Sequence, residues 1–235
     1  MLRAGAVVLL ATIVAASPAA AQAPGRPGPW SLDVRGVSSP VPDDPTFYPR
    51  LDASALVPDR GFGLEAGAHV YLFNLGPARL GVGAALYAVR AITEPPPAPP
   101  PAAGTVARPG QRVQVDQRLL TPQVSFNFGT RDGWSYLSAG AGRTEVVAKT
   151  AGAITGRRES QSLRTLNVGG GARWFLRSHF GVGFDIRVHL VGSGTAGAIE
   201  ETPATPPPAT PAPPVAPTTT PSLRMVTISG GFSFK

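Results

Sequence analysis

Charged and imidazole side chains recur at alternate positions within apolar stretches of this 235-residue chain. Alternate residues of a β-strand point to the same side of a sheet, so these groups would gather on one face. On an enclosed face, carboxylates, guanidinium groups and imidazoles can form ion pairs, line a polar path or act as acids and bases. The members of this set are Asp33, Arg35, Glu65, His69, Arg79, Arg173, Asp185, Arg187 and His189.

The spacing of these residues gives little support to catalysis or metal binding. The chain has three histidines, His69, His179 and His189, and none stands beside a serine in a suggestive spacing. A GxSxG-type nucleophile elbow is absent, and no histidine and carboxylate cluster has ligand spacing within one element. The chain has no cysteine, which excludes thiolate nucleophiles, thiolate metal sites and disulfides. We therefore predict no catalytic residue, no metal ligand and no cofactor.

Eight stretches carry this alternation and predict eight strands. It is clearest after residue 179, where the apolar set Phe180, Val182, Phe184, Ile186, Val188 and Leu190 opposes Gly181, Gly183, Asp185, Arg187 and His189. The predicted strands are approximately 30–37, 61–73, 78–90, 117–129, 134–149, 163–176, 180–190 and 223–235. About 9–11 residues suffice to cross a bilayer when a strand is tilted. An even number of strands suits a closed single-chain barrel.

The joins between these stretches alternate in length. Turns of about three or four residues follow the second, fourth and sixth strands, whereas the other joins have roughly 13 to 32 residues. Short turns at one rim and long loops at the other are the layout of outer-membrane barrels, with the short turns on the periplasmic side. Both ends of the barrel segment then fall on the periplasmic rim.

The long joins are rich in proline. Pro95–Pro101 and the Ala/Pro/Thr tract from Pro203 to Pro221 favour extended, solvated polyproline II, and further prolines punctuate residues 40–58. Such extracellular loops could serve as recognition tips that bind a surface ligand, or as stiff spacers.

The first residues resemble a secretion signal. Arg3 is followed by an apolar run, 4–16, and by Ala19-Ala20-Ala21, which predicts cleavage after Ala21. The predicted organisation is a signal peptide over 1–21, a short linker over 22–29 and a barrel over 30–235. No later stretch approaches the 18 apolar residues of a transmembrane helix.

The net charge of +7 is spread over dispersed arginines. Nucleic-acid binding would require a clustered basic face, so anionic lipid headgroups or lipopolysaccharide are the better partners, and no nucleic acid is expected. Aromatic residues near the short-turn rim predict a periplasmic girdle of Trp30, Phe73, Trp134, Trp174 and Phe175. Strict alternation would turn Trp134 inward, and a bulge near Ser135 would be needed to place it in the girdle.

By this pattern the chain resembles the small eight-stranded outer-membrane β-barrel family, which includes the transmembrane domain of outer-membrane protein A and outer-membrane protein X. The resemblance covers residues 30–235 and rests on architecture, not on a sequence motif. It implies insertion by the barrel assembly machinery, which in this family recognises a terminal aromatic residue. Here Phe232 and Phe234 alternate, but Lys235 is last, so the aromatic residue comes one place early.

The sequence therefore predicts an all-β fold: an eight-stranded antiparallel up-and-down transmembrane β-barrel with short periplasmic turns and long Pro-rich extracellular loops. The predicted location is the cell outer membrane, and the predicted role is structural or surface-interactive. A small low-conductance pore for small polar solutes is the alternative, and the resemblance to small outer-membrane barrels adds a lipid-A-modifying enzyme as the third. The polar network expected to fill the lumen comprises Asp33, Arg35, Glu65, His69, Arg173, Asp185, Arg187 and His189.

Overall fold

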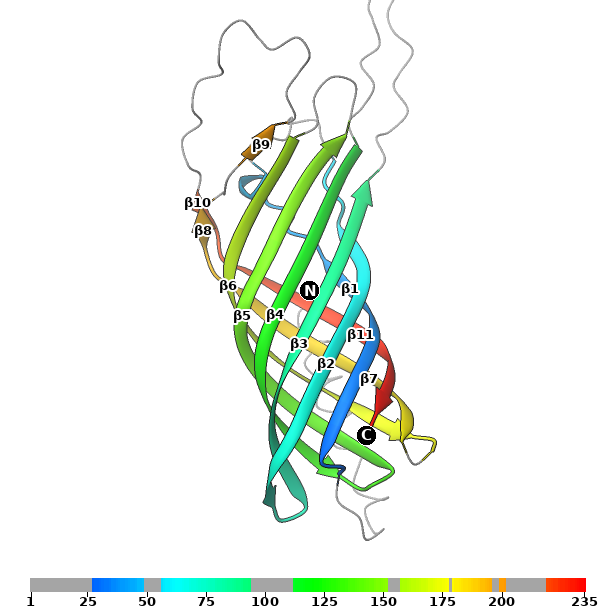
Figure 1. Ribbon diagram of the computed structural model, residues 1–235. Helices are drawn as coiled ribbons and strands as arrows, with labels where there is room; N and C mark the ends of the chain where they lie inside the picture. The colour runs from blue at the N-terminus through cyan, green and yellow to red at the C-terminus, as the bar shows by residue number, and fades with distance from the viewer. Residues whose placement is uncertain are drawn as a thin grey trace, which may run out of the picture.

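Eight long strands wrap into a closed barrel (Figure 1). The computed structural model describes residues 27–48, 56–93, 112–151, 157–177, 179–195, 199–201 and 219–235. The barrel strands are β1 Trp30–Pro40, β2 Arg60–Leu75, β3 Ala78–Thr93, β4 Arg112–Gly129, β5 Gly133–Ala151, β6 Arg157–Phe175, β7 Phe180–Val191 and β11 Leu223–Phe234. The predicted signal peptide, most of the predicted linker and most of the two proline tracts lie outside the described residues. No helix among the described residues is long and apolar enough to cross a membrane.

Each barrel strand pairs antiparallel with the next, and β1 closes the sheet by pairing with β11. The closing register runs from Leu32 opposite Phe234 to Ser38 opposite Ile228. Closure leaves no barrel strand with an open edge, so the backbone groups of neighbouring strands pair around the whole circumference. The predicted eight-stranded antiparallel barrel is therefore confirmed.

Several strands extend further than the sequence pattern predicted at the long-join end. β4 begins at Arg112 instead of 117, and β6 begins at Arg157 instead of 163. The alternation continues there, but the apolar residues now lie on the inner face and the polar residues on the outer face: Val113 and Val115 point inward and are buried, while Asp116 points outward. A prediction based on apolar residues of the outer face therefore misses the long-join ends of β4 and β6.

The outer face of the barrel is apolar over its middle. Its exposed side chains include Leu32, Val34, Phe62, Leu64, Val70, Val82, Leu86, Leu120, Val124, Leu137, Leu166, Val168, Val226 and Ile228. In a soluble protein such a continuous apolar belt would be exposed to water, whereas a lipid-facing barrel requires it.

The predicted aromatic girdle is only partly correct. Trp30, Phe73 and Trp174 are exposed on the outer face near the short-turn rim. Trp134 and Phe175 instead point into the barrel and are buried. The register of β5 is uninterrupted from Trp134 onward, so the bulge expected near Ser135 is absent and strict alternation holds. A register shift does occur in β2 between Tyr71 and Phe73, and it leaves Phe73 facing outward.

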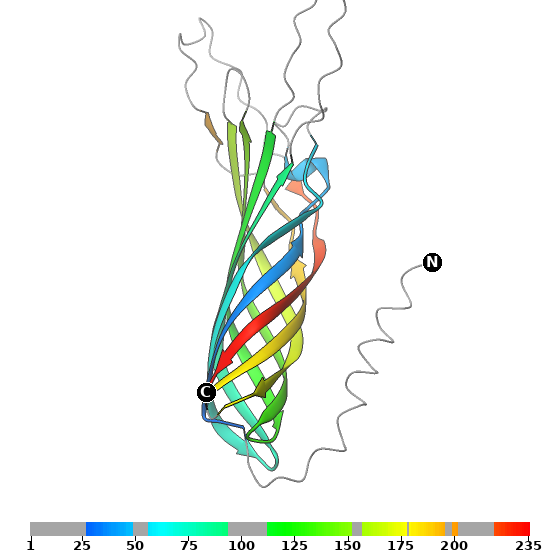
Figure 2. The ribbon, with the colours of Figure 1, turned by 90° about the vertical axis from the view of Figure 1, so that its right-hand side faces the viewer.

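The two rims differ in construction, as Figure 2 shows. The rim that holds the C-terminus carries the tight joins, including the β2–β3 turn, where Gly76 adopts a φ of 61°. At the other rim, two short strands, β8 Gly194–Thr195 and β10 Thr219–Thr220, pair with each other. A third, β9 Ile199–Glu201, pairs with the start of β6.

Residues 41–48, which we call the mouth plug, fold into the barrel opening at the long-join rim. Phe47 belongs to the short helix η1 Pro45–Phe47, and its side chain is 1% exposed. The carbonyl oxygen of Phe47 accepts a 2.7 Å hydrogen bond from Gln161 Nε2, and Tyr48 donates its hydroxyl proton to the Pro42 carbonyl at 2.8 Å. The plug packs on an inward apolar cluster that includes Ala91, Val113, Val115, Val146, Ala148, Leu163, Val191 and Met225. Hydrophobic packing therefore closes this end of the lumen.

The start of the plug is organised by Asp44. Its carboxylate accepts hydrogen bonds from the backbone amide of Thr46 at 2.9 Å and from the Thr46 hydroxyl at 2.6 Å. These bonds favour the ionised form and hold the pKa of Asp44 below its usual value.

The tightness of the barrel wall can be tested with two inward-facing glycines that lie on neighbouring strands. A Cβ at Gly83 would overlap the backbone oxygen of Ala68 and the ring of His69, whereas a Cβ at Gly67 would lie 3.8 Å from its nearest neighbours. We expect Gly83→Ala to lower the free energy of unfolding in micelles by about 1–3 kcal/mol, the usual cost of overpacking. Gly67→Ala should change it by much less. Urea titration followed by tryptophan fluorescence measures both, and equal effects would contradict the close strand approach at Gly83.

Candidate functional site: the polar network of the lumen

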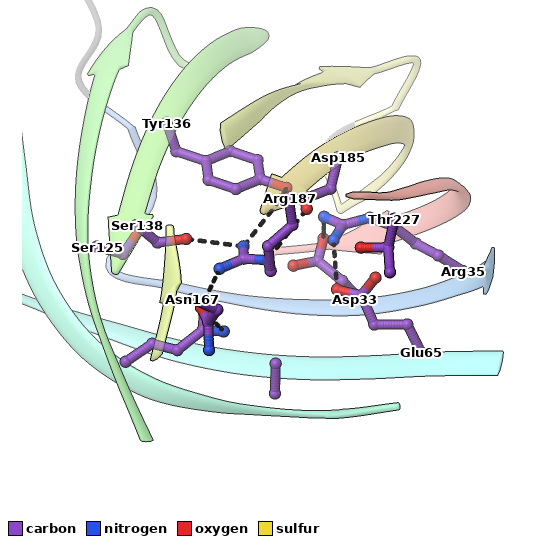
Figure 3. A network of polar contacts seen from close by, with 12 residues as sticks. Asp33, Arg35, Glu65, Ser125, Tyr136, Ser138, Asn167, Asp185, Arg187 and Thr227 are labelled. Atoms are coloured by element: carbon purple, nitrogen blue, oxygen red, sulfur yellow. Dashed lines mark hydrogen bonds and ion pairs between the residues drawn. The ribbon is translucent and has the colours of Figure 1, made fainter. Parts of the chain in front are cut away.

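Below the mouth plug, the lumen holds buried ionisable side chains of both signs (Figure 3). Three are arginines, from β1, β6 and β7, and three are carboxylates, from β1, β2 and β7. They are Arg35, Arg173, Arg187, Asp33, Glu65 and Asp185. All six belong to the predicted lumen network, and the structure places them together within hydrogen-bonded clusters.

Asp33 is the centre of the first cluster. Arg173 donates two hydrogen bonds to the carboxylate of Asp33, from Nε to Oδ1 at 2.9 Å and from Nη2 to Oδ2 at 2.6 Å. The Ser233 hydroxyl donates to Oδ1 at 2.6 Å, and Arg35 Nη2 lies 2.8 Å from the same oxygen. The remaining amino group of Arg173 donates to Asn127 Oδ1 at 3.3 Å. Asp33 thus joins β1 to β6 and, at the closure of the barrel, to β11.

Asp185 and Arg187 form the second cluster. They are two residues apart on β7, so both point inward, and Arg187 donates to both oxygens of Asp185 at 3.2 and 2.9 Å. Arg187 also donates to Asn167 Oδ1 at 2.7 Å and to Ser138 Oγ at 2.8 Å. This guanidinium therefore ties β7 to β5 and β6.

Tyr136 connects the two clusters. Its hydroxyl donates to Asp185 Oδ2 at 2.7 Å, while its ring lies under the guanidinium of Arg173, whose Cζ is 3.9 Å from the ring centroid. Arg35 Cζ lies 5.7 Å from the same centroid, and Arg35 continues the chain of contacts to Glu65 Oε1 at 3.2 Å. A cation over an aromatic face is attracted by the ring quadrupole, most strongly where water is excluded. The sequence pattern placed Tyr136 on the inward face, but a search restricted to charged residues did not identify it as a member of the network.

The three positive and three negative charges of the network balance one another. Isolated charges in a low-dielectric interior cost several kcal/mol each, and this cost is offset only where ion pairs have good geometry and further hydrogen bonds. The bidentate Arg173–Asp33 and Arg187–Asp185 pairs, with their amide and hydroxyl partners, satisfy that condition. Their geometry suits a fixed structural filling of the lumen.

The two predicted histidines of the network lie at its margin. His69 Nε2 is 3.3 Å from Gln123 Oε1, and His189 Nε2 is 3.0 Å from the Thr227 hydroxyl. Neither contacts a carboxylate through a hydrogen bond in the described part of the chain. Arg79, which also has inward parity, lies near the short-turn rim and donates to Asn74 Oδ1 at 3.0 Å in an exposed contact.

The lumen leaves little free space. A cavity of about 10 Å³ is lined by residues that include Glu65, Tyr87, Thr121, Arg187 and His189. This volume is about that of one water molecule. Within the described ranges, no group of three or more histidine, aspartate or glutamate residues could hold a metal ion.

Aromatic side chains close the short-turn end of the lumen. Trp134 packs on Phe175 with ring centroids 4.6 Å apart and meets the edge of Tyr71 at 6.4 Å. Lys235 Nζ lies 4.0 Å from the centroid of Phe175 and donates to the backbone oxygen of Arg131. We call Tyr71, Trp134, Phe175 and Lys235 the lumen floor. The residues that miss the predicted girdle therefore seal the barrel from inside.

A closed eight-strand meander with an apolar outer belt, a polar lumen and rims of unequal loop length is an outer-membrane β-barrel by architecture. No protein-family model matches the sequence. No curated protein sequence matches it either.

Comparison with solved structures gives barrels of low sequence identity. Ail, the attachment invasion locus protein of Yersinia pestis, crystallised with the heparin analogue sucrose octasulfate, is 15% identical, with a TM-score of 0.46 over 87% of this chain and 96% of Ail. Neisserial surface protein A is 12% identical, with a TM-score of 0.46 over 88% of this chain and 97% of that protein. The outer membrane protease OmpT of Escherichia coli is 10% identical, with a TM-score of 0.44 over 75% of this chain and 64% of OmpT. The class of this chain rests on its own strand order and register, not on these similarities.

The coupling of Arg173 to Asp33 can be measured directly. Arg173→Met should lower the free energy of unfolding in micelles by about 3–5 kcal/mol, because it leaves Asp33 charged and short of its main partner. The double variant Asp33→Asn/Arg173→Met should lose less than the sum of the two single variants. Arg177→Met, at an exposed position of the β6–β7 turn, is the matched control and should change stability by less than about 0.5 kcal/mol. Additive losses in the double variant would show that the two residues are not coupled.

Proposed function

We propose that this protein is a structural barrel of the outer membrane whose lumen is closed and whose long joins are presented at the cell surface. The observation that carries the proposal is the filling of the lumen at three successive levels. The mouth plug closes the long-join end, the ion-pair network occupies the middle and the lumen floor closes the other end. The cavity lined by Glu65, Tyr87, Thr121 and Arg187 has room for about one water molecule, with a volume of about 10 Å³.

A conducting pore requires more space than these contacts leave. A hydrated solute would have to separate the Arg173–Asp33 pair, whose oxygen and nitrogen atoms are 2.6 Å apart, and to displace Phe47 from its buried site. Each step exposes a buried charge or an apolar surface, and both are costly. The packing therefore favours the closed structural role over the low-conductance alternative.

The protein would reach the outer membrane by the route that the sequence predicts. Residues 1–21 would direct export, residues 22–29 would link to the barrel, and the barrel assembly machinery would insert residues 30–235. Phe232 is exposed on the outer face of β11, where an assembly factor could contact it before lipid does. The Pro-rich joins would extend from the surface and could bind a ligand there.

An enzymatic role is not part of the proposal. His69 and His189 are buried in the lumen wall and hydrogen-bonded to an amide and a hydroxyl. His179 lies in the β6–β7 join at the short-turn rim, which would be the side away from the outer leaflet. These positions give no exposed acid and base pair at the level of lipid A.

Conductance separates the structural role from the pore. The protein is first refolded and shown to migrate differently in boiled and unboiled gel samples, which is the mark of a closed barrel. In a planar bilayer with KCl on the order of 1 M, it should then give no resolvable steps of current. A reconstituted general porin is the positive control. Steady steps whose ion selectivity changes in Arg187→Ala or Asp185→Asn would overturn the closed-lumen proposal, because only a path past these residues could respond to them.

Lipid analysis tests the absence of enzymatic activity. Expression of the intact chain in a Gram-negative host should leave the mass spectrum of lipid A identical to that of the empty-vector control. A change by the mass of one acyl chain that disappears in His179→Ala would instead establish a lipid-A-modifying activity.

A further inference from the structure

Six arginines project outward from six of the barrel strands just above the apolar belt. We call this set the arginine collar: Arg60 on β2, Arg90 on β3, Arg118 on β4, Arg143 on β5, Arg164 on β6 and Arg224 on β11. All six are exposed. The next outward residue toward the short-turn rim is apolar on every one of these strands: Phe62, Ala88, Leu120, Ala141, Leu166 and Val226. The change from apolar to cationic is therefore abrupt and occurs around most of the circumference.

The collar stands one membrane thickness above the opposite end of the belt. The exposed Trp174 follows Arg164 by ten positions on β6, and Phe128 follows Arg118 by ten positions on β4. A rise of about 3.3 Å per residue gives about 33 Å along the strand, and a tilt of about 40° reduces this to about 25 Å of height. This is the height of the apolar band of outer-membrane barrels, so the collar lies at the level of the lipid headgroups.

Two collar arginines face each other directly. Arg143 and Arg164 are register partners on β5 and β6, and like charges at such positions repel. Other collar members have acidic neighbours: Arg90 forms a 2.7 Å ion pair with Asp116, and Arg118 is the register partner of Glu145. Across β4, the register partner of Arg143 is Leu120, and no ion pair to Arg143 or Arg164 is made by the described residues. Glu145, the next outward residue of β5, is the nearest carboxylate in the register, and it lies opposite Arg118.

We propose that the arginine collar binds the phosphate groups of anionic lipids in the outer leaflet, with Arg143 and Arg164 as its principal site. Guanidinium groups bind phosphate with paired hydrogen bonds, and one phosphate between the two side chains would relieve their repulsion. The exposed Leu120 lies beside Arg143 as its register partner, and the exposed Leu166 follows Arg164 by two positions, so the occupant would need acyl chains beside its phosphate to cover them. That requirement favours a phosphorylated lipid over a soluble anion. The inference rests on the membrane placement of the proposed function.

The test uses the full mature barrel folded in neutral, non-ionic micelles. Lipid A with its phosphates is titrated into the micelles, and the urea midpoint of unfolding is followed by gel mobility, since a ligand of the folded state raises it. Dephosphorylated lipid A and inorganic phosphate are titrated in parallel. The variant is Arg143→Gln/Arg164→Gln, and the matched control is Arg131→Gln/Arg177→Gln, which removes the same charge at the short-turn rim.

Phosphorylated lipid A should raise the midpoint of the wild-type barrel, while dephosphorylated lipid A and inorganic phosphate should not. The collar variant should bind about 25-fold more weakly, about fivefold for each arginine removed, and the control variant should bind like the wild type. Without lipid, the collar variant should have a higher midpoint than the wild type, because the repulsion between the two arginines is gone. If the two arginines had only a structural role, their removal would not raise the midpoint without lipid and also weaken the response to phosphorylated lipid A.

Equal binding by the collar variant and the wild type would overturn the proposal, as would equal loss in the two double variants, which would indicate attraction to net charge alone. A response to inorganic phosphate as strong as that to the lipid would replace the lipid by a soluble anion. A chain that shows no heat-modifiable band in micelles would contradict the proposed function itself. A folded barrel without a lipid response would contradict only the collar.

Discussion

The satisfaction of backbone hydrogen bonds is the constraint on which the rest of this structure depends. Within hydrocarbon there is no water to pair with a free amide or carbonyl group, so a sheet can lie there only if it has no edge. The β1–β11 register, from Leu32 opposite Phe234 to Ser38 opposite Ile228, removes the last edge. Once the sheet is closed, the outward side chains of the apolar belt face lipid and the inward ones face the lumen. The two-residue period of the strand then determines the environment of each residue.

The interior of so narrow a barrel must be filled by its own side chains. Three kinds of side-chain packing fill it along the barrel axis: apolar residues at the mouth, ion pairs in the middle and aromatic rings at the lumen floor. Arginine suits the middle layer because its planar group can bind one carboxylate with two donors and still reach an amide or an aromatic face, as Arg173 does with Asp33, Asn127 and Tyr136. The same residue type serves another purpose outside, where the collar meets the headgroup region.

Strict alternation explains why much of this was predictable from the sequence. Parity alone placed Asp33, Arg173 and Asp185 on the inner face, and the structure buries all three. Parity also turned Trp134 inward; the error came from giving the general preference of tryptophan for interfaces more weight than the local period. The mouth plug could not be predicted because residues 41–48 have no period, and their burial depends on contacts with β4, β5 and β6, far away in the chain. Partner choice within the network was likewise out of reach, since Asp33 and Ser233 are 200 residues apart and meet only at closure.

The distribution of charges in the lumen has a consequence for how the barrel can fold. The bidentate ion pair of the first cluster joins strands that are not neighbours in the sheet: Asp33 lies on β1 and Arg173 on β6, with β11 and β7 between them. A partly assembled sheet that holds β6 without β1 would therefore leave Arg173 without its carboxylate partner, at a cost of several kcal/mol. Intermediates with some hairpins inserted and others absent are penalised, and β11, the last strand in the chain, completes the coordination of Asp33 through Ser233. The lumen thus makes folding cooperative across the whole circumference, in a chain whose backbone pairings are almost all between neighbours in sequence.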